Sequence, residues 1–380
     1  MEIIANIAGK GLAHLDIQES QIRSVRVDSP IDPSAPFVSL GFVDIQINGF
    51  AGIDFSDADL DLPKALNVLP AVWKTGVTAI CATLITNSIE QLQRNFRVLE
   101  TARQRDARFA ATVPAYHLEG PYLSPGPSHG AHDPKLMHPP DWEEFKTLQE
   151  AAGGRIAIVT LAPELPGACD FIRQAAAAGV VVALGHTDGS PEDVHAAVEA
   201  GARLSTHLGN GCPQMIHRHQ NPLWAQLAND HLNASLICDG FHLPPDFVRV
   251  AFRMKGVGRS ILVTDAVHVA GLPPGRYSLV GLNIELLPSG QVVRMDRASM
   301  AGSALSMNRA VAVFQKFTGA SLSEALEAAT VNPRRLLRGA GLSTSLEAGQ
   351  PADLVVFRPE PEELRIETVL LRGEPVYSSN

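Results

Sequence analysis

The chain has 380 residues, of which 45% are hydrophobic and 19% are charged, and its formal net charge is −9. A chain of this length exceeds one small domain and suits a large domain accompanied by a smaller one. The negative charge argues against nucleic acid or an anionic membrane surface as a partner. No run of about 18 apolar residues occurs, so we expect no membrane span.

The beginning of the chain has no basic segment followed by an apolar one, so we expect no signal peptide. The four cysteines form no CxxC pair, and they stand at Cys81, Cys169, Cys212 and Cys238. We therefore expect reduced thiols and a cytoplasmic location.

A short β-branched run, followed by a loop and a segment of helical periodicity, recurs along the chain. Eight such runs are predicted as strands: 38–49, 77–86, 110–120, 155–164, 180–187, 202–209, 233–242 and 259–267. Helices are expected between them, among them 170–179, 190–201 and 243–256. Strands that alternate with helices pair in parallel through right-handed crossovers. Eight repeats favour an α/β fold of the TIM-like (β/α)₈ barrel type. An open doubly wound sheet is the alternative, but it would usually carry a GxGxxG loop after its first strand.

The two ends of the chain do not fit the barrel repeat. Residues 1–37 and 346–380 read as short alternating strands, and we expect them to pair in space as a small β-sandwich domain. The barrel domain is then expected to span residues 38–345. A hairpin-like insert is predicted at 275–296, where it could cover the barrel mouth or belong to the small domain.

Polar side chains stand at the carboxyl ends of the predicted strands. These positions are occupied by Gln46, Asn48, Glu119, His186, His207, His242 and Asp265. In a barrel the carboxyl ends of all strands meet in one ring, where active sites lie. Residues that are far apart in the sequence are therefore expected to converge, which packing requirements alone would not explain.

One carboxylate and two imidazoles, Glu119, His186 and His207, form a set that suits a divalent transition metal such as Zn²⁺ or Fe²⁺. Three protein ligands leave a position for water, whose pKa a metal can lower from about 15.7 to about 7. Asp265 ends an apolar strand, where an unpaired carboxylate would be costly. Beside such a water it can take a proton and later return it to a leaving nitrogen. The alternatives are unrelated polar residues in a pocket and an aspartate that caps the next loop.

Six motifs in chain order, GFVDIQING, HLEGP, GHT, THLGN, DGFH and VTDA, resemble those of the N-acetylglucosamine-6-phosphate deacetylases of the amidohydrolase superfamily. The similarity covers residues 38–310, and GQPADLVV resembles the returning tail of that family. It implies a metal-dependent hydrolase that removes acetate from a phosphorylated amino sugar, with one divalent metal per subunit. Zn²⁺ is the first expectation, with Fe²⁺, Co²⁺ or Mn²⁺ as alternatives. A homodimer is expected through the resemblance alone.

The resemblance also implies roles for individual residues. Glu119, His186 and His207 match metal ligands, and Asp265 matches the catalytic acid and base. His132 matches a histidine that helps to bind the substrate and polarise its carbonyl. The other substrate contacts implied are Asn210 and Gly211 at the sugar, Arg218 and His242 at the phosphate, and Ala301 and Gly302 in the loop 299–307. In some relatives the phosphate contacts come from a neighbouring subunit.

Strand one departs from the pattern of many amidohydrolases, which carry an HxH pair there as ligands of a second metal. This chain has Gln46 and Asn48 instead. Amides are poor ligands for a transition metal beside imidazole. In this the chain resembles the subgroup of the superfamily that holds one metal tightly, and we expect a single metal.

The loop 207–224 also departs from the family pattern, with Gly209, Gly211 and Cys212 along the sugar wall and a basic cluster of His217, Arg218 and His219. Such a cluster beside a glycine-rich turn can bind phosphate, or it can be a solvated loop. The substrate alternatives are N-acetylgalactosamine-6-phosphate, another N-acyl amino sugar and an N-acyl amino acid. A barrel without catalysis that serves as a binding or scaffold protein is the alternative outside the enzymes.

Overall fold

The centre of the molecule is a parallel eight-stranded barrel. The computed structural model describes residues 1–279, 281–296 and 300–379. The barrel strands are β5 (Phe42–Ile47), β8 (Val77–Ile85), β9 (Ala115–Glu119), β10 (Ile156–Leu161), β11 (Val181–Leu184), β12 (Leu204–Ser205), β13 (Asn233–Ile237) and β14 (Ser260–Val263). Neighbours pair in chain order, and a parallel bridge between Ile47 and Ala266 joins the first strand to the segment after the last. The predicted TIM-like barrel is confirmed.

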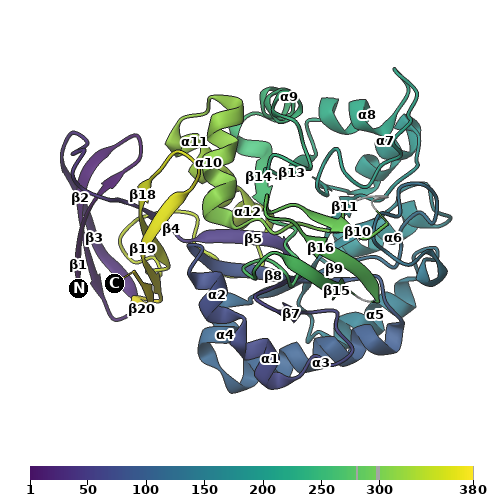
Figure 1. Ribbon diagram of the computed structural model, residues 1–380, viewed down its shortest axis with the longest axis horizontal. Helices are drawn as coiled ribbons and strands as arrows, with labels where there is room; N and C mark the ends of the chain where they lie inside the picture. Colours follow the sequence, from purple (N-terminus) through teal and green to yellow (C-terminus); the bar gives the residue numbers. More distant parts are fainter. Residues whose placement is uncertain (280, 297–299, 380) are drawn as a thin grey trace.

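Helices surround the barrel (Figure 1). They are α1 (Leu62–Asn67), α2 (Leu69–Trp73), α3 (Ile89–Arg105), α4 (Ala107–Thr112), α5 (Trp142–Ala151), α6 (Ala168–Ala177), α7 (Pro191–Ala200), α8 (Pro222–Ala228), α9 (Pro245–Lys255), α10 (Met307–Thr318), α11 (Leu322–Ala329) and α12 (Val331–Leu336). Local sequence sets their ends: Ser190 and Asp193 form a capping box at the start of α7, and Gly201 ends it. None of the helices described here is long and apolar enough to cross a membrane.

Two predicted strands begin later than expected. Residues 110–112 belong to helix α4, because the Asp106 side chain accepts a hydrogen bond from the Phe109 amide and caps that helix. The first predicted strand divides at Gly41, where β4 (Phe37–Leu40) leaves the barrel and pairs with the strands of the chain ends. A Cβ atom at Gly41 would lie 2.2 Å from Thr78 Cγ2, so this crossing point has room only for glycine.

The two chain ends meet in one seven-stranded sheet, in the order β20-β19-β18-β4-β1-β2-β3. Its strands are β1 (Glu2–Ile7), β2 (Gly11–Gln18), β3 (Gln21–Ser29), β4, β18 (Leu354–Pro359), β19 (Leu364–Leu371) and β20 (Glu374–Ser378). The purple and yellow strands lie side by side at one side of the barrel (Figure 1). A separate apolar core contains Leu15, Val38 and Leu354, so both ends contribute to it. The expected pairing of the termini is confirmed, and the division at residues 37 and 346 stays a prediction.

The insert after β14 forms a small antiparallel sheet of β15 (Gly275–Leu279), β16 (Leu282–Leu286) and β17 (Val292–Arg294). A two-stranded hairpin, β6 (Gly49–Phe50) and β7 (Ile53–Asp54), follows β5. The insert packs on Val269 and Ala301 with its own apolar core, and Leu279 lines the cavity at the barrel mouth. Of the two places considered for this insert, the structure shows the barrel mouth.

Candidate active site

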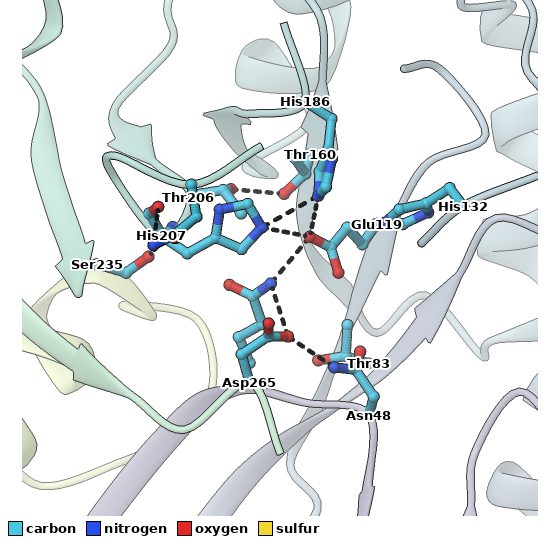
Figure 2. Close-up of polar contacts among 12 residues, drawn as sticks. Asn48, Thr83, Glu119, His132, Thr160, His186, Thr206, His207, Ser235 and Asp265 are labelled. Atoms are coloured by element: carbon cyan, nitrogen blue, oxygen red, sulfur yellow. Dashed lines mark hydrogen bonds and ion pairs between the residues drawn. The ribbon is translucent and has the colours of Figure 1, made fainter. Parts of the chain in front are cut away.

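Three strand ends bring one carboxylate and two imidazoles together at the carboxyl end of the barrel. Glu119 is the last residue of β9, and His186 and His207 each follow their strand by two residues. Glu119 Oε1 lies 3.3 Å from His186 Nε2 and 3.1 Å from His207 Nε2, and the two nitrogens are 3.1 Å apart (Figure 2). Ligand atoms at about 2.0–2.1 Å from a tetrahedral ion are separated by roughly 3.3 Å. The three residues therefore fit one divalent transition metal.

The backbone turns sharply where these side chains are presented. His186, His207 and Asp265 have φ angles of 50°, 29° and 49°, in the left-handed region that residues other than glycine rarely adopt. Each of them stands two residues beyond the end of its barrel strand. Such outliers gather at functional sites, where the surrounding structure holds them in place. All three side chains line one cavity at this end of the barrel.

The charges of the cluster stabilise one another. Burial opposes the charged form of Glu119, but hydrogen bonds from His186 and His207 hold the pKa of that carboxyl well below its ordinary value. Burial also opposes a charged His207, yet the hydrogen bond and the charge of Glu119 raise the pKa of His207. A buried anion that attracts positive charge is the electrostatic environment a cation requires.

Amide side chains stand where a second metal would need imidazoles. Gln46 Nε2 donates to Glu119 Oε1 at 2.9 Å. Asn48 Nδ2 donates to Asp265 Oδ1 at 2.7 Å (Figure 2). These donors satisfy the two carboxylates directly. Within the described part of the chain, Glu119, His186 and His207 form the only close group of three or more His, Cys, Asp or Glu side chains suited to an ion.

Asp265 is buried beside this cluster. Burial raises the pKa of Asp265 to about 6, the negative charge of Glu119 adds to the rise, and the hydrogen bond from Asn48 works against it. A carboxyl group with a pKa near neutrality can both accept and return a proton. It follows the last barrel strand, β14, by two residues and lies across the ring from His186 (Figure 2).

Neighbouring groups orient the imidazoles. His186 Nδ1 is hydrogen-bonded to the Ser128 carbonyl at 2.9 Å, which leaves Nε2 free to bind an ion. His132 packs edge-on against His186, with ring centroids 4.5 Å apart, and its Nδ1 lies 2.8 Å from the Thr86 hydroxyl. Burial, with the nearby His186, lowers the pKa of His132 to about 3, so this ring is neutral.

A cavity of about 330 Å³ opens above the cluster, a size suited to a small ligand. Of the residues predicted from the sequence, it is lined by Glu119, His132, His186, His207, Asn210, Gly211, His242, Asp265 and Gly302. Two others lie elsewhere: Ala301 is buried in the core of the insert, and Arg218 is exposed on the loop before α8. Residue 299, the first of the predicted substrate loop, lies outside the described residues.

Sequence reasoning missed three groups that hold site residues in place. Thr86 binds His132, the Ser128 carbonyl binds His186, and Asp239 Oδ2 lies 2.6 Å from His242 Nδ1. Only Asp239 had a local signal, because it stands three residues before His242 in the DGFH motif.

The chain belongs to the amidohydrolase family, whose sequence profile matches residues 37–376. Among its relatives, the N-acetylglucosamine-6-phosphate deacetylase of Bacillus subtilis is 31% identical over 378 residues, covering 96% of this chain and 93% of the relative. The human N-acetylglucosamine-6-phosphate deacetylase is 32% identical, covering 93% of this chain and 86% of the relative. The N-acetylgalactosamine-6-phosphate deacetylase of Escherichia coli O157:H7 is 31% identical, covering 91% and 89%.

Two solved structures of deacetylases are also similar to this chain along nearly its whole length. A mutant N-acetyl-D-glucosamine-6-phosphate deacetylase of Mycobacterium smegmatis, in complex with N-acetyl-D-glucosamine-6-phosphate, has a TM-score of 0.88 at 31% identity and covers 99% of this chain and all of its own. The deacetylase of Thermotoga maritima has a TM-score of 0.89 at 26% identity, with both chains fully covered.

Proposed function

We propose that this protein is a metal-dependent deacetylase that removes acetate from N-acetylglucosamine-6-phosphate to give glucosamine-6-phosphate. The observation that carries the proposal is the ring of Glu119, His186 and His207 with Asp265 beside it, at the mouth of an amidohydrolase barrel. The deacetylases of Bacillus subtilis, human and Mycobacterium smegmatis, similar along nearly the whole chain, support this substrate.

Glu119, His186 and His207 would hold one divalent transition metal, for which we propose Zn²⁺, with Fe²⁺, Co²⁺ or Mn²⁺ as alternatives. When bound, such an ion would act as a Lewis acid, which lowers the pKa of water and polarises the amide carbonyl. The chain contributes the remaining steps through Asp265 and His132.

Asp265 accepts a proton from the attacking water as the bond between the water oxygen and the acetamide carbon forms. The same carboxyl then gives a proton to the sugar nitrogen while the carbon–nitrogen bond breaks, which releases acetate and the free amine. We propose that the Thr86 hydroxyl, 2.8 Å from His132 Nδ1, donates to that nitrogen and so leaves the ring hydrogen on Nε2. That Nε2–H donates to the acetamide oxygen as negative charge develops on it.

The substrate phosphate requires positive charge that the cavity itself lacks. Among the described residues that line the cavity, none is lysine or arginine. His242, held by Asp239, faces the cavity, and we propose that it contacts the phosphate. We propose that Arg218 completes this site from a second copy in a homodimer. Two exposed apolar side chains support an interface there: Met215, 91% exposed and three residues before Arg218, and Trp224, 53% exposed, whose Nε1 donates to the Arg218 carbonyl.

The second candidate substrate is N-acetylgalactosamine-6-phosphate. The Escherichia coli deacetylase named for it is as similar to this chain as the Bacillus subtilis enzyme, at 31% identity. The two sugars differ at one hydroxyl, and Gly211 and Cys212 in the departing loop line the cavity.

We propose a cytoplasmic location, which suits the absence of a disulfide among the four thiols.

Acetate release from a panel of sugars tests the substrate. We expect the zinc-loaded protein to hydrolyse N-acetylglucosamine-6-phosphate on the order of tenfold or more faster than its galacto epimer, because a site built around one hydroxyl leaves polar groups unpaired with the other. Faster hydrolysis of the epimer would favour the second candidate. No release from either phosphorylated sugar would overturn the proposal.

The phosphate contact has its own variant, Arg218→Ala. It should raise KM for the phosphorylated sugar and leave unphosphorylated N-acetylglucosamine unaffected, whereas the exposed control Arg173→Ala should change neither. An equal loss on both sugars would remove Arg218 from this role.

A further inference from the structure

Three buried polar side chains lie one layer below the candidate metal ligands, and the proposed mechanism uses none of them. His117 stands two residues before Glu119 in β9, Thr160 lies in the neighbouring β10, and Thr206 directly precedes His207. Their side chains are at most 2% exposed. Polar groups at this depth are costly unless each of them has a hydrogen-bond partner.

These side chains form one continuous chain of hydrogen bonds across the barrel. His117 Nδ1 lies 3.1 Å from the Ile45 carbonyl, and His117 Nε2 lies 2.7 Å from Thr160 Oγ1. Thr160 Oγ1 in turn lies 2.8 Å from Thr206 Oγ1, and Figure 2 shows the two hydroxyls facing each other beside the imidazoles. The chain therefore links β5, β9, β10 and the segment after β12.

Only one arrangement of hydrogens satisfies this chain when the ring is neutral. The Ile45 carbonyl can only accept, so His117 Nδ1 carries the ring hydrogen and Nε2 is an acceptor. The Thr160 hydroxyl must then donate to Nε2, and its oxygen accepts from the Thr206 hydroxyl. Each donor has one acceptor, so the loss of the middle hydroxyl breaks two bonds at once.

Gly185 leaves the space in which the two threonines meet. A Cβ atom at this position would lie 2.8 Å from Thr206 Cβ and 3.0 Å from Thr160 Cγ2. Contacts of that length do not occur without displacement of the neighbours. The glycine of the GHT motif is thus explained by the hydroxyl pair behind it, as the histidine of HLEGP is explained by the bond to Thr160.

We propose that His117, Thr160 and Thr206 are positioning residues, which set the relative places of Glu119 and His207 at the metal site. Each member stands near a site residue: Ile45 precedes Gln46, His117 is two residues before Glu119, and Thr206 precedes His207. Thr160 is the partner of Glu119 in the register of β10 and β9. A metal site needs its ligands held to within about 0.5 Å, and hydrogen-bonded supporting groups provide that precision. This inference rests on the metal site of the proposed function.

The test is Zn²⁺ affinity, measured by competition with a chromophoric chelator on the full-length protein. Thr160→Val keeps the shape of the side chain and removes the central hydroxyl, and Thr160→Ser restores the hydroxyl. Thr112→Val is the matched control. Thr112 is equally buried, but it lies in helix α4, outside the barrel, where its hydroxyl accepts a hydrogen bond from Trp73 Nε1. If Thr160→Val does not fold, Thr206→Val takes its place in the test, because it breaks only the last hydrogen bond of the chain.

We expect Thr160→Val to weaken Zn²⁺ binding by about tenfold or more, since supporting groups of metal ligands typically contribute 10- to 100-fold. Thr160→Ser should bind within about threefold of the wild type, and Thr112→Val should lower Tm without changing Zn²⁺ affinity. Wild-type affinity in Thr160→Val and Thr206→Val, or an equal loss in Thr112→Val, would overturn the inference and leave the metal site standing. A wild type that binds no Zn²⁺ would overturn both.

Discussion

At the scale of single residues, two carboxylates a few ångströms apart are held in different states by different partners. Glu119 receives hydrogen bonds from two imidazoles and an amide, which favour its anion. Asp265 receives one short hydrogen bond, from Asn48, and burial raises the pKa of Asp265 to about 6. Groups whose environments separate their pKa values divide the work between them, so one binds a cation and the other carries a proton.

Replacement of Asp265 by asparagine tests this division. Asp265→Asn keeps the volume and the contact with Asn48 but removes the proton acceptor, so we expect unchanged Zn²⁺ content and a fall in kcat of roughly 10²- to 10⁴-fold. Metal analysis and initial rates of acetate release measure the two quantities, and the control is Asp246→Asn, because the Asp246 side chain in α9 is exposed. Near-normal turnover would remove Asp265 from the acid–base role.

The ligand set and Asp265 could be predicted from the sequence because each stands at the end of an apolar run, where a barrel collects functional groups. The supporting groups could not. Thr86 and Ser128 reach the site only through the folding of loops, and a backbone carbonyl such as that of Ser128 leaves no mark in the sequence.

At the scale of elements, the turn after β9 explains why the carboxylate of Glu119 is followed at once by a glycine. Gly120 has φ = +84°, and a Cβ atom there would lie 2.2 Å from Thr86 Oγ1. The close approach of this turn lets Thr86 bind His132 while Glu119 points into the ring. Glycine is therefore needed for both the backbone conformation and the space.

Gly120→Ala should lower the free energy of unfolding by about 1–3 kcal/mol and displace Thr86, with a loss of kcat/KM for deacetylation. Gly179→Ala is a matched control, because Gly179 has φ = +80° and nothing within 4 Å of its Cβ position. It should carry the conformational cost without loss of activity. Denaturant unfolding and steady-state rates measure the two effects, and full activity in Gly120→Ala would refute the link from this turn to His132.

The boundaries of two strands escaped prediction for a physical reason. The apolar run from residue 109 to 120 is compatible with helix and strand, and the cap at Asp106 decides for helix in its first part. The apolar run that starts at residue 38 contributes first to the sheet of the chain ends and then to the barrel. The pattern of apolar residues within the run does not show where it changes from one sheet to the other.

At the scale of the whole molecule, a buried carboxyl closes the barrel between its first and last strands. Asp44 Oδ2 accepts a hydrogen bond from the Thr264 hydroxyl at 2.5 Å. Asp44 Oδ1 accepts from the backbone N–H groups of Thr264 and Gln46, at 3.2 and 3.3 Å. The residues that follow, Gln46 and Asp265, face each other across this seam. Burial raises the pKa of Asp44 to about 7, well above its ordinary value.

This raised pKa predicts a pH dependence of stability. Between about pH 4, where an unfolded aspartate titrates, and pH 7 the native state binds the extra proton, so rising pH lowers the free energy of unfolding. Over three pKa units the loss approaches about 4 kcal/mol. Asp44→Asn lacks this group, so its stability relative to the wild type should improve from pH 4.5 to 7.5 in urea unfolding of metal-free protein. A constant difference between the two proteins would show that Asp44 is ionised in the native state.

The pairing of the chain ends was also predictable, since both ends alternate like strands and neither fits the βα repeat. Their order in the sheet was not, because β4 lies between β1 and β18 and pairs with β18 across more than 300 residues of the chain. Long-range pairing of this kind depends on the barrel that holds the ends near each other.

The central claim is that the carboxyl end of the barrel holds one metal ion through three side chains. Anomalous diffraction at the zinc edge, from crystals of zinc-loaded protein, measures it most directly. The account predicts a single full peak per chain at about 2.0–2.2 Å from Glu119 Oε1, His186 Nε2 and His207 Nε2. A peak held by other residues, or a second full peak at Gln46 and Asn48, would contradict it.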